Sequence, residues 1–254
     1  LSVSAKGKAP SCVHCGKAFQ SWKCSFCNRD KQYLAGRGIE RAAEEISRAF
    51  PGFPVVISAG EVIKDRVDAK PALVLATAGA QPQVEGGYSA VVILDGIRFF
   101  SHTDLRTQER ARELFFETSS LISKKGIVLL IIDESHPVVS AIARWNVAPL
   151  IKRELSERSD LHLPPSVFST VLVMEQSIGI QIVNGLKKAL TDGRIPESAR
   201  IYGPTEMSKG QVKVVIHADI KDAQDLTDVV HELQRRRSIA KKDLFTLRVE
   251  PYSL

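Results

Sequence analysis

The sequence predicts an α/β protein in three parts, and three observations support that prediction. All four cysteines lie near the N-terminus as two C-x2-C pairs. Short runs of Val, Leu and Ile then alternate with helical patterns, which is typical of parallel strands buried on both faces. The last third gives the order β-α-β-β-α-β, the ferredoxin-like arrangement. We therefore expect a zinc-knuckle segment at residues 1–33, an α/β lobe at 34–162 and a ferredoxin-like α+β domain at 163–254.

Composition narrows the class of protein. The chain has 254 residues, of which 44% are hydrophobic and 25% charged, as in soluble globular proteins. No apolar run approaches the roughly 18 residues of a membrane span, and the first residues lack a signal core, so we expect a cytoplasmic protein. The net charge of +6 points mildly to an anionic partner, although ordinary solubility charge explains it equally well.

The cysteine segment predicts a zinc site. The four candidate ligands are Cys12, Cys15, Cys24 and Cys27. Each pair lets two thiolates reach one tetrahedral Zn2+, and Gly16 and Asn28 follow the pairs as the turn residues that such knuckles require. The gap between the pairs is shorter than in self-contained zinc fingers. The alternative, a redox or disulfide role, needs an oxidising compartment or a thioredoxin-like context that the sequence does not show.

The central lobe is organised around residues 72–126. Apolar runs at Leu73–Thr77 and Ala90–Leu94 flank a loop rich in Gly, Gln and Pro. A helical pattern from about Thr103 to Lys124 then leads to a third apolar run, Ile127–Asp133. Because α/β proteins bind ligands at the carboxyl ends of parallel strands, the loops that follow these runs are where a functional site is expected.

A polar cluster follows the third run. Asp133, Glu134, Ser135 and His136 resemble a hydrolase constellation, but they precede Pro137 at a first-turn position. Acids and Ser in that place more often cap a helix, so capping is the favoured interpretation and an unrelated α/β hydrolase is a distant alternative. Leu163-Pro164-Pro165 is typical of a domain boundary. The other elements expected in this lobe are the amphipathic helix 36–50, the strand Phe53–Ile57 and the helix Val147–Arg158.

The C-terminal part carries a cluster of cations. Its expected strands are Phe168–Glu175, Ala199–Gly203, Gln211–Ala218 and Leu244–Val249, and its expected helices are Ser177–Thr191 and Ala223–Arg237. The second helix ends in cations that continue into the next turn, namely Arg235, Arg236, Arg237, Lys241 and Lys242. They either contact phosphates or are solvated cations favoured by the helix dipole, and the sequence leaves both possibilities open.

Several short motifs, in order along nearly the whole chain, point to a family. After the cysteine pairs they are Gly36-Arg37-Gly38-Ile39-Glu40, Phe50-Pro51-Gly52, Asp104-Leu105-Arg106 with Glu109-Arg110, His136-Pro137, Leu163-Pro164-Pro165, Tyr202-Gly203-Pro204 and Val249-Glu250-Pro251. In this set the chain resembles the C-terminal half of the PriA family, the primosomal replication-restart DNA helicases (primosomal protein N-prime). The resemblance implies that the α/β lobe is the second, RecA-like helicase lobe.

The chain departs from that family in two segments. Where the family has G-T-Q-x-x-x-K-G-x-x-F, the loop Thr77–Gly87 contains no Lys. Where the family has Q-x-x-G-R-A-G-R, the stretch Glu117–Lys124 contains no Arg. A positioned Arg is worth several powers of ten in phosphoryl transfer, and the flexible Lys124 does not replace a guanidinium fork. The chain therefore resembles a divergent branch with degenerate helicase motifs.

The resemblance implies a function in replication restart. It implies DNA binding and primosome assembly at stalled or forked DNA, without helicase activity of its own, and it leaves open whether the chain is part of an enzyme. The alternative is an active ATP-dependent 3'-5' DNA helicase whose first lobe is missing from this chain, so ATP enters only by family analogy. The implied partners are forked or single-stranded DNA, other primosome components and the single-strand-binding protein, which would bind near Lys213. The implied location is the nucleoid in the bacterial cytoplasm, and no membrane partner is implied.

The resemblance also bears on zinc. In the family, four C-x2-C pairs build two interleaved four-thiolate sites. The pairs present here match the last two, so Cys12 with Cys15 would belong to one site and Cys24 with Cys27 to the other. Each site would then need a further upstream pair.

Overall fold

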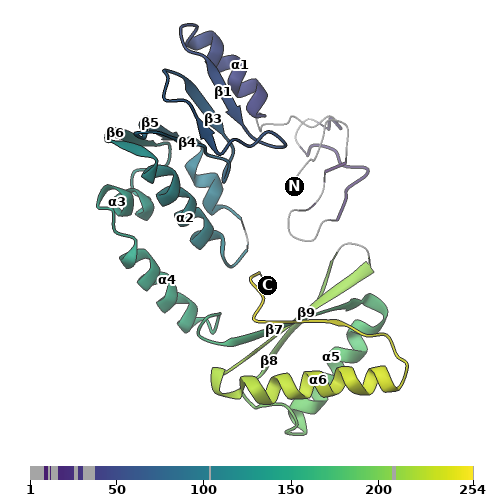
Figure 1. Cartoon of the computed structure of the whole chain (residues 1–254). Helices are drawn as coiled ribbons and strands as arrows, with labels where there is room; N and C mark the ends of the chain where they lie inside the picture. The colour runs from purple at the N-terminus through teal and green to yellow at the C-terminus, as the bar shows by residue number, and fades with distance from the viewer. Residues whose placement is uncertain are drawn as a thin grey trace. The chain divides into compact units, whose positions relative to one another are not determined.

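The structure of the chain is a computed structural model that describes residues 9–10, 12, 17–25, 28–30, 38–102, 104–207 and 210–253. The chain divides into two compact units, Lys31–Leu150 and a second unit of Leu1–Asp30 with Ile151–Leu254 (Figure 1). The division falls within helix α4 (Ala148–Asp160), between Leu150 and Ile151, and so lies twelve residues before the boundary expected at Leu163. Among the described residues, no helix has the length and apolarity needed to cross a membrane.

The unit Lys31–Leu150 is built on parallel strand pairs. Strand β1 (Val55–Ser58) pairs with β3 (Leu73–Ala76), β2 (Arg66–Val67) with β4 (Gln83–Val84), and β5 (Tyr88–Ile93) with β6 (Ile122–Leu130). Parallel pairing is what the alternation of apolar runs and helices predicts. In the described part of the unit the pairs form separate two-stranded sheets and not one continuous sheet.

The helices of this unit follow the sequence pattern with one correction. They are α1 (Ile39–Ala49), the 3-10 helix η1 (Gly96–Phe100), α2 (Thr107–Ser120) and α3 (Pro137–Ala143). The helical pattern was expected to run to Lys124, but α2 ends at Ser120 and Ile122 already pairs with Tyr88 in β6. A strand replaces the last helical turn here because the backbone of Ser123 packs directly against Gly87, which has φ +80°. A Cβ at position 87 would lie only 2.6 Å from the backbone nitrogen of Ser123, so this close approach requires glycine.

Helices α2 and α3 cover one face of the β5–β6 pair. Phe115 of α2 is fully buried there, with Val91 and Ile93 of β5 and Val138 of α3. Its ring centroid lies 6.0 Å from that of Phe99 and 5.4 Å from that of Phe100, both on η1. The βαβ unit from β5 through α2 to β6 is thus closed by one compact apolar cluster.

The other face of the β5–β6 pair is open, which corrects the expectation that these strands are buried on both faces. Its alternating apolar side chains are between 49% and 61% exposed, and they are Val92, Leu94, Ile127, Leu129 and Ile131. A parallel crossover normally carries a helix that covers a sheet face. Separately, the connection from β1 to β3, residues 59–72, is described throughout and contains no helix, so the β1–β3 pair lacks the helix of a usual parallel crossover.

The C-terminal domain has the predicted order of elements. They are β7 (Phe168–Glu175), α5 (Gln176–Thr191), β8 (Arg200–Glu206), β9 (Gln211–Ala218), the 3-10 helix η3 (Ile220–Asp222), α6 (Ala223–Ile239) and β10 (Thr246–Val249). The strands form one antiparallel sheet in the order β10-β7-β9-β8. Both helices lie on one face of this sheet (Figure 1).

The core of this domain lies between the helices and that face. Alternate residues of the central strands, such as Leu172 on β7 and Val214 on β9, are fully buried against Leu226 and Val230 of α6.

The segment that precedes the C-terminal domain is held by Arg158, near the end of α4. Arg158 pairs with Glu154 and donates a hydrogen bond of 3.1 Å to the carbonyl of Pro164.

Candidate functional site

The two cysteine turns close in the same way. The backbone N–H of Cys12 donates to the carbonyl of Lys17 at 2.9 Å, and that of Cys24 donates to the carbonyl of Arg29 at 2.9 Å. The two loops therefore have the same span, as expected if both are knuckles of one kind. Asn28, expected as the turn residue of the second knuckle, adopts the left-handed conformation with φ 54°.

The metal itself stays a prediction. Cys15, Cys27 and Gly16 lie outside the described residues. Within the described part of the chain there is no group of three or more side chains that could hold a metal, and that part contains only one cysteine of each pair. The thiolates of Cys12 and Cys24 have the right chemistry for zinc, and the closed turns fit a C-x2-C knuckle.

The two segments that lack the family's cations are in contact. Gln81, in the loop Thr77–Gly87, donates from Nε2 to the Thr118 Oγ1 of α2 at 3.0 Å. The loop is fixed further by the buried Ser58, whose Oγ donates to the carbonyl of Ala80 at 2.7 Å and accepts the Lys64 N–H at 3.0 Å. The contact between the two segments thus joins the side-chain amide of Gln81 to the hydroxyl of Thr118.

A shallow depression lies beside this loop. It has a volume of about 310 Å³ and is lined by residues 63–66 with Gly79, Ala80, Gln81 and Gln83. Its cations are Lys64 and Arg66, which come from the β1–β3 connection and are exposed. They are surface side chains and not a fixed pair aimed at a phosphate.

The polar cluster before α3 does cap the helix, as predicted, but the capping side chain is that of His136 and not of an acid or Ser135. His136 is the N-cap residue, and its Nδ1 accepts the N–H of Val138 at 3.3 Å. The carboxylate of Asp133 accepts the Ser135 hydroxyl at 2.6 Å and the Ser135 N–H at 2.8 Å, and these hydrogen bonds lower the pKa of Asp133. Burial lowers the pKa of His136, whose ring lies 4.4 Å from that of Phe100. These hydrogen bonds stabilise the turn at residues 133–136 and the N-terminus of α3.

The arginines at the end of α6 already have partners within the domain. Glu232 accepts hydrogen bonds from Arg235 at 2.6 and 2.9 Å and from Arg236 at 2.7 Å. These bonds lower the pKa of Glu232 to about 2, so it stays ionised. Arg237 is buried, and its Nε donates to the carbonyl of Asp243 at 2.7 Å.

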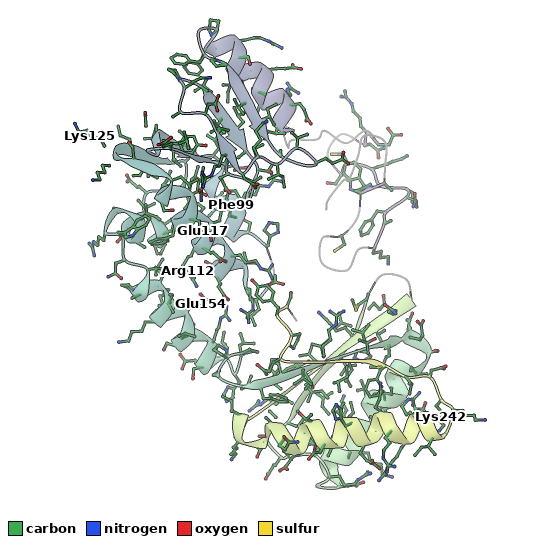
Figure 2. All side chains as sticks on the ribbon, in the orientation of Figure 1. Phe99, Arg112, Glu117, Lys125, Glu154 and Lys242 are labelled. Carbon is green, nitrogen blue, oxygen red and sulfur yellow. The ribbon has the colours of Figure 1, made fainter. Side chains whose placement is uncertain are left out.

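The remaining predicted cations lie at separate places in the C-terminal domain. Lys241 and Lys242 are exposed in the turn after α6, and Lys242 extends away from the domain (Figure 2). Lys213 is half-buried on β9, where it lies opposite Val173 of β7. The structure therefore does not gather Arg237 and Lys213 with the exposed cations of the α6 end.

Sequence reasoning missed two contacts that shape these surfaces. Glu232 lies three and four residues before Arg235 and Arg236, a spacing at which helix side chains pair, so this signal was available. The Gln81–Thr118 hydrogen bond joins residues 37 positions apart and has no local signal.

These observations describe an α/β protein whose candidate sites are loops and charged surfaces. A probable replication restart protein PriA from Mycobacterium leprae is 33% identical over 202 residues, which cover 78% of this chain and 30% of the relative. The protein of the same name from Mycobacterium tuberculosis is 33% identical over 218 residues, covering 83% of this chain and 32% of the relative. The chain belongs to the PriA family of replication restart proteins.

The extent of the match is consistent with the C-terminal half that the motifs indicate. The chain spans 30–32% of the length of these curated relatives. No protein-family model matches the chain.

Proposed function

We propose that the chain is a DNA-binding part of a replication-restart protein that assembles a primosome at stalled or forked DNA, without helicase activity of its own. The relatives, which are named probable replication restart protein PriA, support the assignment to replication restart. In this proposal residues 34–162 form a degenerate second helicase lobe, and residues 163–254, with the sheet β10-β7-β9-β8, form a ferredoxin-like domain that contacts DNA. The nucleoid is then the place of action.

The contact between Gln81 and Thr118 is the observation that carries the proposal of lost motor activity. In helicases of the resembled family, the two segments that meet here carry the Lys and the arginines. Phosphoryl transfer depends on fixed cations that stabilise charge on the transferred phosphate. Here the meeting side chains are an amide and a hydroxyl, and the nearby Lys64 and Arg66 are exposed and belong to another connection.

An ATPase measurement tests this proposal against an active helicase whose first lobe lies outside this chain. The chain is joined to a complete first lobe from an active family member, and turnover is measured with and without forked DNA. We expect turnover far below the roughly 1–100 per second of phosphoryl-transfer enzymes. The active family member is the control. DNA-stimulated turnover at its rate would show that the chain retains a working second lobe.

DNA binding is tested on the chain itself. A fluorescent forked DNA is titrated with the purified chain at several salt concentrations. We expect affinity that is indifferent to sequence and falls steeply with salt, because phosphate contacts release counterions. Absence of binding at low salt would contradict the proposal.

The cysteine segment is proposed to hold zinc, and the C-terminal domain to meet the single-strand-binding protein near Lys213. The equal closure of the Cys12 and Cys24 turns supports the first part. The second part rests on the family resemblance alone.

A further inference from the structure

The β5–β6 pair has one face that no described element covers. Its rows follow the strand register, in which Ala90 lies opposite Ile127 and Val92 lies opposite Leu129. Large apolar side chains occupy these rows and are about half exposed or more, namely Val92 49%, Leu94 59%, Ile127 61%, Leu129 50% and Ile131 54%. We call these five side chains the open face. Apolar side chains gathered in this way on one surface mark an interaction site.

Two lysines lie at the start of the open face. The register with β5 is irregular there, because β6 has extra residues between Ile122 and Ile127. These residues form a bulge that contains Lys124 and Lys125, and bulges commonly re-aim side chains. Both lysines are exposed, and Lys125 extends outward from the unit (Figure 2). Neither lysine makes an ion pair with any described residue, so both charges are available to a partner.

Acids lie at the other end of the open face. Asp95 follows β5, and Asp133 and Glu134 follow β6, and all three are exposed. Hydrogen bonds lower the pKa of Asp133, so this carboxylate stays ionised. Because β5 and β6 run parallel, their starts lie at one end of the face and their ends at the other. Glu85 before β5 and Arg98 on η1 each offset only one charge at their end, so the two ends keep opposite signs.

This arrangement of charges complements itself. Leu129 lies midway along the sequence between Lys124 and Glu134, and also midway between Lys125 and Asp133. A two-fold axis between two such faces, perpendicular to the strands and beside Leu129, therefore places the lysines of one copy against the acids of the other. The same axis places the apolar rows of the two copies against each other. A parallel alignment would instead bring like charges together, so the charges favour the antiparallel one.

We propose that the open face is a dimer interface, with a second copy of this chain as its occupant. The two faces pack about 10 Å apart, as the sheets of a β-sandwich do, with β6 of one copy antiparallel to β6 of the other. The apolar side chains form the centre of the interface and the charged ends form its rim, which is the usual composition of a protein interface. The inference concerns assembly and does not depend on the proposed DNA binding.

A second copy is favoured over an unrelated partner because one surface supplies every complementary feature. A contact across a two-fold axis requires a surface that matches itself, and the open face does so in both its apolar rows and its charged ends. An unrelated partner would have to present an apolar surface of the same extent between two ends of opposite charge.

Sedimentation equilibrium of the purified whole chain, at several concentrations in reducing buffer, tests the proposal. We expect a reversible equilibrium between one and two copies of a 27.9 kDa chain. Leu129→Lys should weaken dimerisation about a hundredfold or more, because a cation from each copy would be buried beside the axis. Ile180→Lys is the matched control, since Ile180 is 65% exposed on α5, outside the open face, and it should leave the equilibrium unchanged. Circular dichroism confirms that each variant is folded.

A set of charge variants tests the antiparallel alignment without changing the apolar rows. Lys124→Glu and Glu134→Lys should each weaken dimerisation about two- to thirtyfold, because a modest ion-pair free energy is lost at both symmetric positions. Combining the two substitutions restores opposite charges across the axis, so the dimerisation constant should return to within about threefold of the parent value. Residues that act only within their own copy would give losses that add.

Four results would overturn the inference. A chain that stays monomeric at every concentration would show that no second copy binds the open face, and the proposed DNA binding would stand. A dimer that Leu129→Lys leaves intact would use another surface. A dimer that disappears when a chelator removes zinc would be bridged by the cysteine segment. Additive losses in the combined charge variant would refute the antiparallel alignment.

Discussion

Phe115→Ala should unfold the α/β unit locally while the C-terminal domain stays folded. Phe115 is fully buried and its ring contacts Phe99 and Phe100, so removing it deletes a large side chain from a cluster with few buried members. Replacing a buried Phe by Ala costs about 3–5 kcal/mol. Domains of this size have about 5–15 kcal/mol in total, so the loss is a large share of the stability of this unit. Figure 2 shows Phe99 close to α2.

Hydrogen exchange measures the effect in each unit separately. With a loss of about 3–5 kcal/mol, amides of β5 and β6 that exchange by unfolding of the unit should exchange faster by about two to four powers of ten. Amides of β9 should keep their protection, because β9 belongs to the other core. Phe116→Ala is the matched control, because Phe116 is only half-buried. Its ring centroid lies 5.1 Å from that of Trp145. Its effect should be clearly smaller.

Two results would refute this reasoning. Equal loss of protection in β5 and β9 would mean that the two units unfold as one. Unchanged exchange in β5 would mean that Phe115 does not hold the cluster together.

The other predictions concern metal, pH and backbone geometry. The purified chain should bind zinc weakly, or bind one zinc ion with all four thiolates. Metal analysis tests this, and two tightly bound zinc ions per chain would contradict it, because four thiolates cannot complete two structural sites. Burial lowers the pKa of His217, so its contribution to stability is complete above the ordinary value of 6.5 and is lost as the pH falls below it. Urea midpoints should therefore fall between pH 7.5 and 5, and His217→Phe should flatten that slope; an unchanged slope would assign it to other groups. Gly87→Ala should destabilise the α/β unit by more than about 1 kcal/mol, because it adds a backbone clash to a strained φ. Gly86→Ala, with the same φ and open space around it, isolates the strain in urea unfolding, and equal effects of the two would argue against the clash.

The C-terminal domain is the part that sequence reasoning predicted best. The expected ranges Phe168–Glu175 and Gln211–Ala218 match β7 and β9 residue for residue, because alternating apolar residues and clear turns mark both ends. Parallel pairing in the α/β unit was also predictable. The open face of β5 and β6 was not, since an unbroken Val/Leu/Ile run is typical of a strand that is buried on both faces.

The candidate sites were harder to predict because their properties depend on long-range contacts. The sequence could place Arg235, Arg236 and Arg237 at a helix end, but not show that Asp243 turns back to accept from Arg237. Arg200 on β8, Lys213 on β9 and Arg248 on β10 lie on one face of the C-terminal sheet, and this becomes visible only with the strand order and register. The capping role of the cluster before α3 was local and could be predicted, although the capping residue is His136 and not the acids or Ser135 that the sequence favoured.

The open face of β5 and β6 has a consequence for aggregation. Residues 126–132 form a stretch of high β-propensity, without charge or Pro, of the kind that pairs with copies of itself when it is accessible. The sequence places Lys124 and Lys125 directly before it and Asp133 and Glu134 directly after it. Charges in those places act as gatekeepers, because stacking copies of the strand in register would bring like charges together. These charges should therefore oppose in-register self-association of strand β6 through its exposed face.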